Sequence, residues 1–208
     1  MDRVSKSALF DLDGVLIDAK DWHYEALNRS LEHHGYRGIP YPEHLARFDG
    51  IPTRVKLAKL CDEKQMKAVD QGSVESHKQD LFLEIVEARC VVDDRLQGEL
   101  ALLRSNGIRL GVCTNSIRRT LDLVLSKLGL ASFFDLTLSN QDIAHPKPHP
   151  EIYEVAMRRL GTLPGSTAII EDSKVGIAAA AASGAHVVIV KGPAEVSARA
   201  VLQVLGLP

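Results

Sequence analysis

Short apolar runs, each closed by polar or turn residues, recur along much of this 208-residue chain. Their length and composition predict five buried β-strands, over residues 6–12, 108–113, 134–138, 167–171 and 186–190. Between the last four runs the apolar positions take helical spacing instead, over residues 117–129, 150–161 and 174–183. This alternation predicts an α/β fold with a Rossmann-like, three-layer core, in which a parallel sheet lies between two layers of helices.

Residues 19–90 break this alternation, because they contain amphipathic patterns but no convincing strand. The patterns predict helices over residues 20–34, 52–60 and roughly 73–89, with Pro40 and Pro42 interrupting them. An all-helical block between the first and second strands is best explained as an insertion that folds as a small α-helical domain. We therefore expect a core made of residues 1–18 and 91–208, and a helical domain made of residues 19–90.

Polar side chains follow the predicted strands at the points where the strands end. They are Asp11 and Asp13 after the first strand, Thr114, Asn115 and Ser116 after the second, Lys147 after the third, and Glu171, Asp172 and Ser173 at the end of the fourth. In an open parallel sheet these strand ends meet at one edge, so we expect the groups to converge. Four carboxylates, one lysine and several small donors suit a hard divalent cation such as Mg²⁺ together with an anionic substrate. A cation would also relieve the repulsion between the first two acids.

Each of these groups also has a purely structural explanation. The Asp-Gly pair at 13–14 is a common turn dipeptide, and the Asn-Ser pair at 115–116 could cap a helix. The Glu-Asp-Ser sequence at 171–173 could cap the helix that follows, and a lysine between prolines, such as Lys147, is usually a solvated loop residue. Their joint placement, in order, after successive strands favours a functional site over coincidence.

Composition narrows the class of protein. The chain is 45% hydrophobic and 25% charged with a formal net charge of −2, which predicts a globular protein with a sizeable core and gives no broad electrostatic reason to bind nucleic acid or membrane. Three widely spaced cysteines, Cys61, Cys90 and Cys113, are expected to be buried thiols in a reducing compartment rather than disulfides or a zinc site. The polar amino terminus predicts no signal peptide or membrane span, and hence a cytoplasmic protein.

Four motifs, in order along the chain, make the sequence similar to the haloacid dehalogenase-like hydrolase superfamily. They are DLDGV at 11–15, TNS at 114–116, Lys147 within KPHPEIY, and EDSKVG at 171–176. The helical block resembles the cap of the helical-cap members, the subfamily of beta-phosphoglucomutase and phosphoglycolate phosphatase. The sequence departs from the family pattern at Pro146, because the residue before the motif lysine is usually small and a proline makes this loop stiffer.

The resemblance implies a role for each motif residue. Asp11 would be the nucleophile that forms an aspartyl-phosphate, and Asp13 would act as the general acid and then as the general base. Thr114 and the backbone of Asn115 would hydrogen-bond the transferring phosphoryl group, while Lys147 would offset the accumulated negative charge. The implied Mg²⁺ ligands are Asp11, the backbone carbonyl of Asp13, Asp172 and, directly or through water, Glu171.

The resemblance also implies substrate contacts from the helical domain. His23, Arg54 and Lys78 stand where similar proteins place cap residues that bind substrate. Each has an alternative explanation: His23 could be an ordinary histidine of an amphipathic helix, and Arg54 and Lys78 could be surface charges. The histidine pair at 33–34 and His44 are expected to face solvent.

The favoured function is a Mg²⁺-dependent phosphatase of a small phosphorylated metabolite, with a sugar phosphate as the favoured class, working as a monomer or small homo-oligomer. The alternative is a phosphomutase of the beta-phosphoglucomutase kind, which returns the phosphoryl group to the sugar. A dehalogenase needs no metal and generally lacks the second acid, so Asp13 disfavours it. A non-enzymatic binding protein would not require Asp11, Asp13, Lys147 and Asp172 together.

Overall fold

The structure is a computed structural model that describes residues 5–48 and 50–208. The chain divides into two compact units, one made of the described residues up to Asp18 together with Val91–Pro208, and the other of Ala19–Cys90. Residues 1–4, which belong to the polar amino terminus discussed above, lie outside the described residues. Within the part that is described, no helix has both the length and the apolar character needed to cross a membrane.

A five-stranded parallel sheet with strand order β3-β2-β1-β4-β5 forms the centre of the larger unit. The strands are β1 (Ser7–Phe10), β2 (Arg109–Cys113), β3 (Leu136–Leu138), β4 (Thr167–Glu171) and β5 (His186–Ile189). At the end of β1, Phe10 pairs with Val112 of β2 and with Ile170 of β4. The next residue, Asp11, therefore leaves the sheet between these two neighbours.

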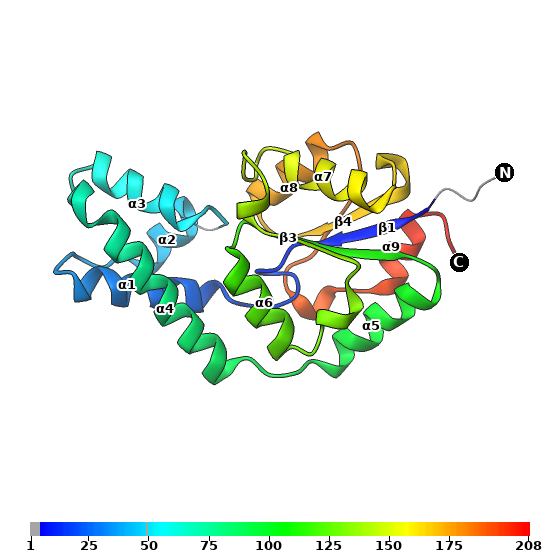
Figure 1. The fold of residues 1–208 in the computed structure, drawn as a ribbon, viewed down its shortest axis with the longest axis horizontal. Helices are drawn as coiled ribbons and strands as arrows, with labels where there is room; N and C mark the ends of the chain where they lie inside the picture. The colour runs from blue at the N-terminus through cyan, green and yellow to red at the C-terminus, as the bar shows by residue number, and fades with distance from the viewer. Residues whose placement is uncertain (1–4, 49) are drawn as a thin grey trace. The chain divides into compact units, whose positions relative to one another are not determined.

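Helices cover both faces of this sheet (Figure 1). On one face lie α7 (Glu151–Leu160) and α8 (Lys174–Ala182), which share an apolar core with the strands through residues such as Leu9, Ile152 and Ile169. On the other face lie α5 (Asp94–Ser105), α6 (Arg118–Lys127) and α9 (Ala198–Val204). Burial on both faces explains why the strands are nearly continuous apolar runs. The predicted three-layer fold class is confirmed.

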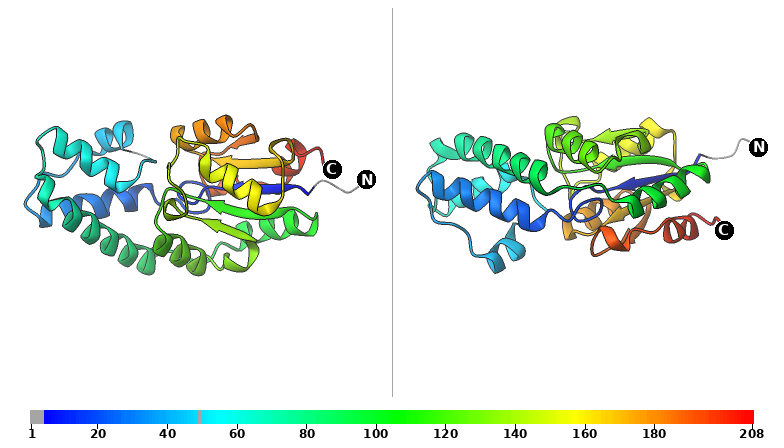
Figure 2. Two further views of the ribbon diagram at one scale, coloured as in Figure 1. Left: turned by 45° about the horizontal axis from the view of Figure 1, so that its top comes forward. Right: turned by 90° about the horizontal axis from the view of Figure 1, so that it is seen from below.

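The smaller unit is helical. Its helices are α1 (Lys20–His33), α2 (Tyr41–Arg47), α3 (Thr53–Asp62) and α4 (Gln71–Arg89). The helices α1 and α4 lie side by side, as both views in Figure 2 show. Their apolar faces close over a core that includes Leu27, Leu31, Phe48, Leu57, Leu60 and Val74. The unit thus has an apolar core made from its own residues.

Three sequence-based expectations need correction. Pro40 and Pro42 do not merely interrupt helices, because they begin α2, where a proline in the first turn loses no helical hydrogen bond. His44 does not face solvent: its side chain is buried, and its ring meets that of Tyr24 edge-on at a centroid distance of 5.3 Å. Of the three cysteines expected to be buried, only Cys113 is buried, and those at positions 61 and 90 are half-buried.

Candidate active site

The strand order reverses at β1. The chain steps from β1 to β2 and β3 on one side and then returns to β4 and β5 on the other, which creates a topological switch point at the carboxyl ends of the strands. The Asp11 N–H donates to the Ile170 carbonyl at 3.0 Å, and the Thr114 N–H donates to the Leu138 carbonyl at 3.0 Å. These bonds hold the residues that follow β1 and β2 in register with neighbouring strands.

Lys147 connects the ends of three strands. Its ammonium donates to Asp11 Oδ1 at 2.8 Å, to Glu171 Oε1 at 2.6 Å and to the Cys113 carbonyl at 2.7 Å. An ammonium has three hydrogens to donate, so this geometry employs its full capacity. The side chain is buried, and the structure therefore excludes the explanation that this lysine is a solvated loop residue.

The electrostatics of this cluster follow from burial and from the nearby charges. Burial raises the pKa of Asp11 well above its usual value, and the Glu171 carboxylate raises it further, while Lys147 opposes both effects. Burial alone would lower the pKa of the Lys147 ammonium, but the carboxylates of Asp11 and Glu171 outweigh it and raise this pKa. Two buried carboxylates facing one ammonium favour the approach of another positive charge.

Asn115 holds the backbone of the lysine in place. The Lys147 N–H donates to Asn115 Oδ1 at 3.0 Å, and Asn115 Nδ2 donates to the Lys147 carbonyl at 3.3 Å. The amide side chain thus positions the lysine, and only the backbone of Asn115 is left for the predicted phosphoryl contact. Thr114, also predicted to contact the phosphoryl group, is buried, and its hydroxyl accepts the Ser116 N–H at 3.0 Å.

Asp13 lies at the start of a tight turn. Gly14 adopts a φ of +85°, and its N–H donates to the Ile17 carbonyl at 2.6 Å. The Asp13 side chain is half-buried, and Ser116 Oγ donates to its Oδ2 at 2.7 Å. Ser116 therefore orients the second acid, a role that its place in the TNS motif did not reveal.

Tyr153 is a further member of the cluster that the sequence did not single out. Its hydroxyl donates to Glu171 Oε1 at 2.5 Å, and its ring centroid lies 4.9 Å from the Lys147 ammonium. Burial, followed by the charges of Glu171 and Asp11, raises the pKa of Tyr153 well above its usual value, so the hydroxyl remains a donor. The available signal was an aromatic residue on the core face of the predicted helix 150–161, which is also the pattern of ordinary core packing.

The carboxylates fit a hard divalent cation. Oxygen atoms of Asp11, Glu171 and Asp172 all lie within 4.8 Å of one another, and oxygen is the donor type that Mg²⁺ prefers. A Cβ at Gly14 would fall 2.0 Å from Asp172 Oδ2, and a Cβ at Gly176 would fall 2.0 Å from the Glu171 carboxylate. The two glycines therefore make room for the acids. Glu171 already accepts hydrogen bonds from Lys147 and Tyr153. It is therefore better suited to contact the ion through a water molecule, in an outer position, than to bind it directly.

The predicted cap residues all lie in the helical unit. Lys78 Nζ and His23 Nδ1 are 3.0 Å apart, and both lie against Phe82, the histidine stacked on its ring at 4.0 Å and the ammonium 4.8 Å from its centroid. Lys78 is only 4% exposed, which rules out the surface-charge explanation for it. Arg54 is exposed on α3, so that explanation still applies there.

Comparison with protein families identifies the chain. Residues 8–190 match the haloacid dehalogenase-like hydrolase family. The chain belongs to this family. The match spans both the sheet and the helical insertion of this hydrolase and confirms the resemblance suggested by the four motifs.

Individual relatives and solved structures agree with this assignment. A phosphorylated carbohydrates phosphatase of Thermotoga maritima is 31% identical over 183 residues, which is 86% of this hydrolase and 82% of the relative. A pyrophosphatase, PpaX, of Bacillus pumilus is 28% identical over 178 residues, 86% of this chain and 79% of the relative. A beta-phosphoglucomutase structure from Clostridium difficile superposes with a TM-score of 0.83 over 97% of both chains, and at 19% identity it shows the fold alone.

Proposed function

We propose that this hydrolase is a Mg²⁺-dependent phosphatase of a small phosphorylated metabolite, with a sugar phosphate as the favoured class, and that it works through an aspartyl-phosphate. The observation that carries the proposal is the buried Lys147 ammonium, which contacts both Asp11 and Glu171 beside Asp172. In this proposal residues 1–18 and 91–208 form the catalytic core, and residues 19–90 form its cap.

The family and the class of reaction follow from the comparisons with known proteins. The chain is a member of a hydrolase family, and relatives covering most of its length are named as phosphatases. These relatives confirm the prediction of a phosphoric monoester hydrolase. Their named substrates, phosphorylated carbohydrates in one case and pyrophosphate in another, support a small phosphorylated metabolite as the substrate class.

The two acids that follow β1 would have different roles in the reaction. An oxygen of Asp11 attacks phosphorus, so that a new P–O bond forms while the bond to the leaving oxygen breaks, and Asp13 donates its proton to that oxygen. Asp13 then takes a proton from the water that cleaves the acyl phosphate. Thr114 and the Asn115 backbone bind phosphoryl oxygens, and Lys147 stabilises the charge that accumulates.

The acids also define how a cation would be held. Asp11, the Asp13 carbonyl and Asp172 would bind Mg²⁺ directly, with Glu171 in the outer position described above. When bound, the ion supplies positive charge that stabilises the phosphoryl oxygens and keeps the carboxylates ionised. The glycine at position 14 is the feature of this chain that leaves space for the Asp172 carboxylate.

The basic side chains of the helical unit indicate the chemistry of the leaving group. Burial, followed by the nearby basic side chains of Lys56, His23 and Lys78, lowers the pKa of His44 to about 4. Basic side chains therefore gather within this unit, which supports a leaving group rich in hydroxyl or anionic oxygens. We propose His23, Arg54 and Lys78 as its contacts.

The test is phosphate release from an aryl phosphate and from a panel of sugar phosphates, with Mg²⁺ or with EDTA. We expect Asp11→Asn to lower kcat/KM by at least ~10³-fold. Asp122→Asn makes the same chemical change at an exposed residue of α6 and should leave turnover intact. Turnover that survives in Asp11→Asn, or that is equal in EDTA, would contradict the proposal, and an isomerised sugar phosphate without released phosphate would indicate the mutase.

A further inference from the structure

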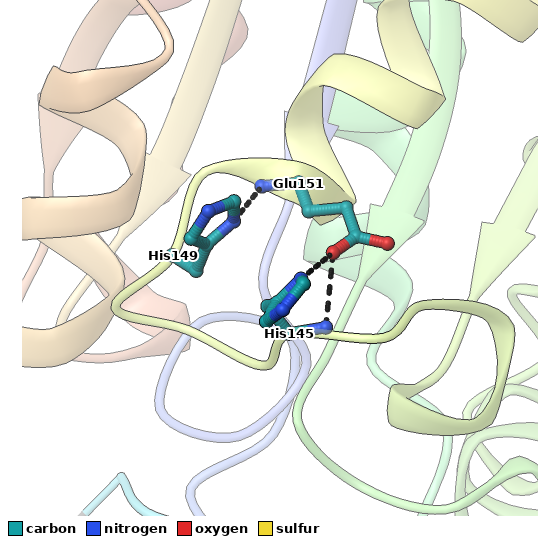
Figure 3. A group of neighbouring side chains, drawn as sticks. All are labelled: His145, His149 and Glu151. Atoms are coloured by element: carbon teal, nitrogen blue, oxygen red, sulfur yellow. Dashed lines mark hydrogen bonds and ion pairs between the residues drawn. The ribbon is translucent and has the colours of Figure 1, made fainter.

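A second group of metal-binding side chains lies in the loop that precedes α7. His145, His149 and Glu151, within the sequence HPKPHPE, offer ligand atoms that lie within 4.8 Å of one another (Figure 3). Among residues 5–48 and 50–208 the only other such group is the acidic one at the strand ends. The two groups differ in chemistry, because this one has two imidazole nitrogens and a single carboxylate.

The carboxylate of this group is held in place by backbone donors. The N–H groups of Ala144 and His145 donate to the two oxygens of Glu151, each at 2.9 Å. His145 Nδ1 lies 2.7 Å from Glu151 Oε2. The Ala144 N–H and then the His145 side chain lower the pKa of Glu151, so the carboxylate is ionised at neutral pH. Such outer hydrogen bonds orient a ligand before the metal arrives.

The imidazole of His149 also contacts Glu151. His149 Nδ1 accepts the Glu151 N–H at 3.2 Å, and the two imidazole rings lie 4.8 Å apart between centroids, inclined by 35°. Pro146, Pro148 and Pro150 lie within this segment and restrict its φ angles. Figure 3 shows the two rings and the carboxylate gathered along this one stretch of loop. Little backbone entropy is left to lose on binding.

We propose that His145, His149 and Glu151 form a binding site for a transition-metal cation of the Zn²⁺ class, separate from the acidic site. Two imidazoles and a carboxylate favour Zn²⁺, Ni²⁺ or Cu²⁺ over Mg²⁺. Zinc ligands lie about 2.0–2.2 Å from the metal and hence roughly 3–3.5 Å from one another. The ligand atoms here already lie within 4.8 Å of one another, so a small approach would close the site. A metal bound at His145 Nδ1 takes the lone pair of that nitrogen, so the ring carries its proton on Nε2, and the metal replaces the contact between this nitrogen and the Glu151 carboxylate.

The test is a titration of the full chain, without a polyhistidine tag and stripped of metal, with Zn²⁺ in competition with a chromogenic chelator. We expect one ion per chain, with His145→Ala and His149→Ala weakening its affinity by more than about tenfold. Mg²⁺ in large excess should not displace the zinc. His186→Ala removes an exposed histidine of β5, distant in sequence from the loop, and should bind zinc as the unaltered chain does.

A second variant tests whether zinc binds at a different group of histidines. The rings of His33, His34 and His77 lie within 5.6 Å of one another in the helical unit and are the competing place for zinc. If His77→Ala abolishes zinc binding, or if His149→Ala leaves it unchanged, the proposal is wrong. Amide exchange of residues 144–151 should slow on addition of zinc, and unchanged exchange there would equally overturn it. The titration needs no catalysis, so its failure is distinguishable from failure of the proposed phosphatase activity.

Discussion

Replacing Tyr153 by phenylalanine removes a single hydroxyl from the most densely charged part of the fold. The ring remains beneath the Lys147 ammonium, and within residues 5–48 and 50–208 the hydrogen bond of this hydroxyl is that to Glu171 Oε1, at 2.5 Å. The change leaves no cavity larger than an oxygen atom. The stability of the variant therefore reports the value of that one bond to a buried carboxylate.

The expected magnitude follows from the partners that remain. A hydrogen bond to a charged group contributes about 1.5–3 kcal/mol to the free energy of unfolding. Glu171 keeps the Lys147 ammonium at 2.6 Å after the change, so its charge is not left unpaired. We therefore expect a loss of about 2 kcal/mol, which corresponds to a fall in Tm of roughly 4–8 °C for a chain of this size.

The assay must observe the sheet rather than the helices. The only tryptophan of the chain, Trp22, lies on α1, so its fluorescence reports the helical unit. Hydrogen exchange at the amides of β1 and β4, followed in increasing urea, reports the sheet instead. Tyr41→Phe, followed by Trp22 fluorescence in urea, is the control in the helical unit, because the Tyr41 hydroxyl donates to the Asp21 carboxylate at 2.6 Å on the surface, where we expect a cost below about 0.5 kcal/mol.

A double-mutant cycle decides whether the carboxylate charge is the cause. In a Glu171→Gln background the hydroxyl meets a neutral acceptor, and the cost of Tyr153→Phe should fall to about 1 kcal/mol. If Tyr153→Phe costs less than about 0.5 kcal/mol, or costs the same in both backgrounds, the reasoning is refuted.

Three further predictions concern a glycine, a buried histidine and the cation. Gly176→Ala places a Cβ 2.0 Å from the Glu171 carboxylate and should destabilise the chain by about 1–3 kcal/mol in urea unfolding, whereas Gly98→Ala, on an open helix surface, should be neutral or stabilising. Because the pKa of His44 is lowered to about 4, the unfolded chain binds the proton first as pH falls below about 6.5, and the helical unit should lose up to about 3 kcal/mol between there and pH 4. Trp22 fluorescence in urea measures this slope, and a His44→Phe variant that keeps the slope would contradict the assignment. Chelation by EDTA should stop phosphate release and excess Mg²⁺ should restore it, and release that persists in EDTA would refute the metal requirement.

The parallel sheet could be predicted because its central strands β1, β2 and β4 are almost entirely buried. Such strands need no alternation of polar and apolar residues, and their short apolar runs stand out against the polar loops around them. The position of the candidate site, at the carboxyl ends of the strands, could be predicted for the same reason. An acid that directly follows an apolar run, as Asp11 does, must lie where the strand ends. The order of the strands then brings Lys147 to Asp11 and Glu171.

Other features depend on tertiary contacts that a pattern does not encode. The hydroxyls of Tyr153 and Ser116 have their hydrogen-bond partners far away in the sequence, at Glu171 and Asp13. His44 is buried on a helix of seven residues, which is too short for its apolar face to be recognised by periodicity. The helices α5 and α9 were not predicted either, and both pack against the side of the sheet opposite to α7.

The pairing of β1 with β2 and β4 has a consequence for how the protein is made. The central strand leaves the ribosome well before the partners on its two sides, at residues 109–113 and 167–171. The intervening helices form a contiguous segment that can fold as soon as it emerges. In a nascent chain the apolar stretch of β1 therefore stays without its partner strands until residues 109–113 and 167–171 have been made.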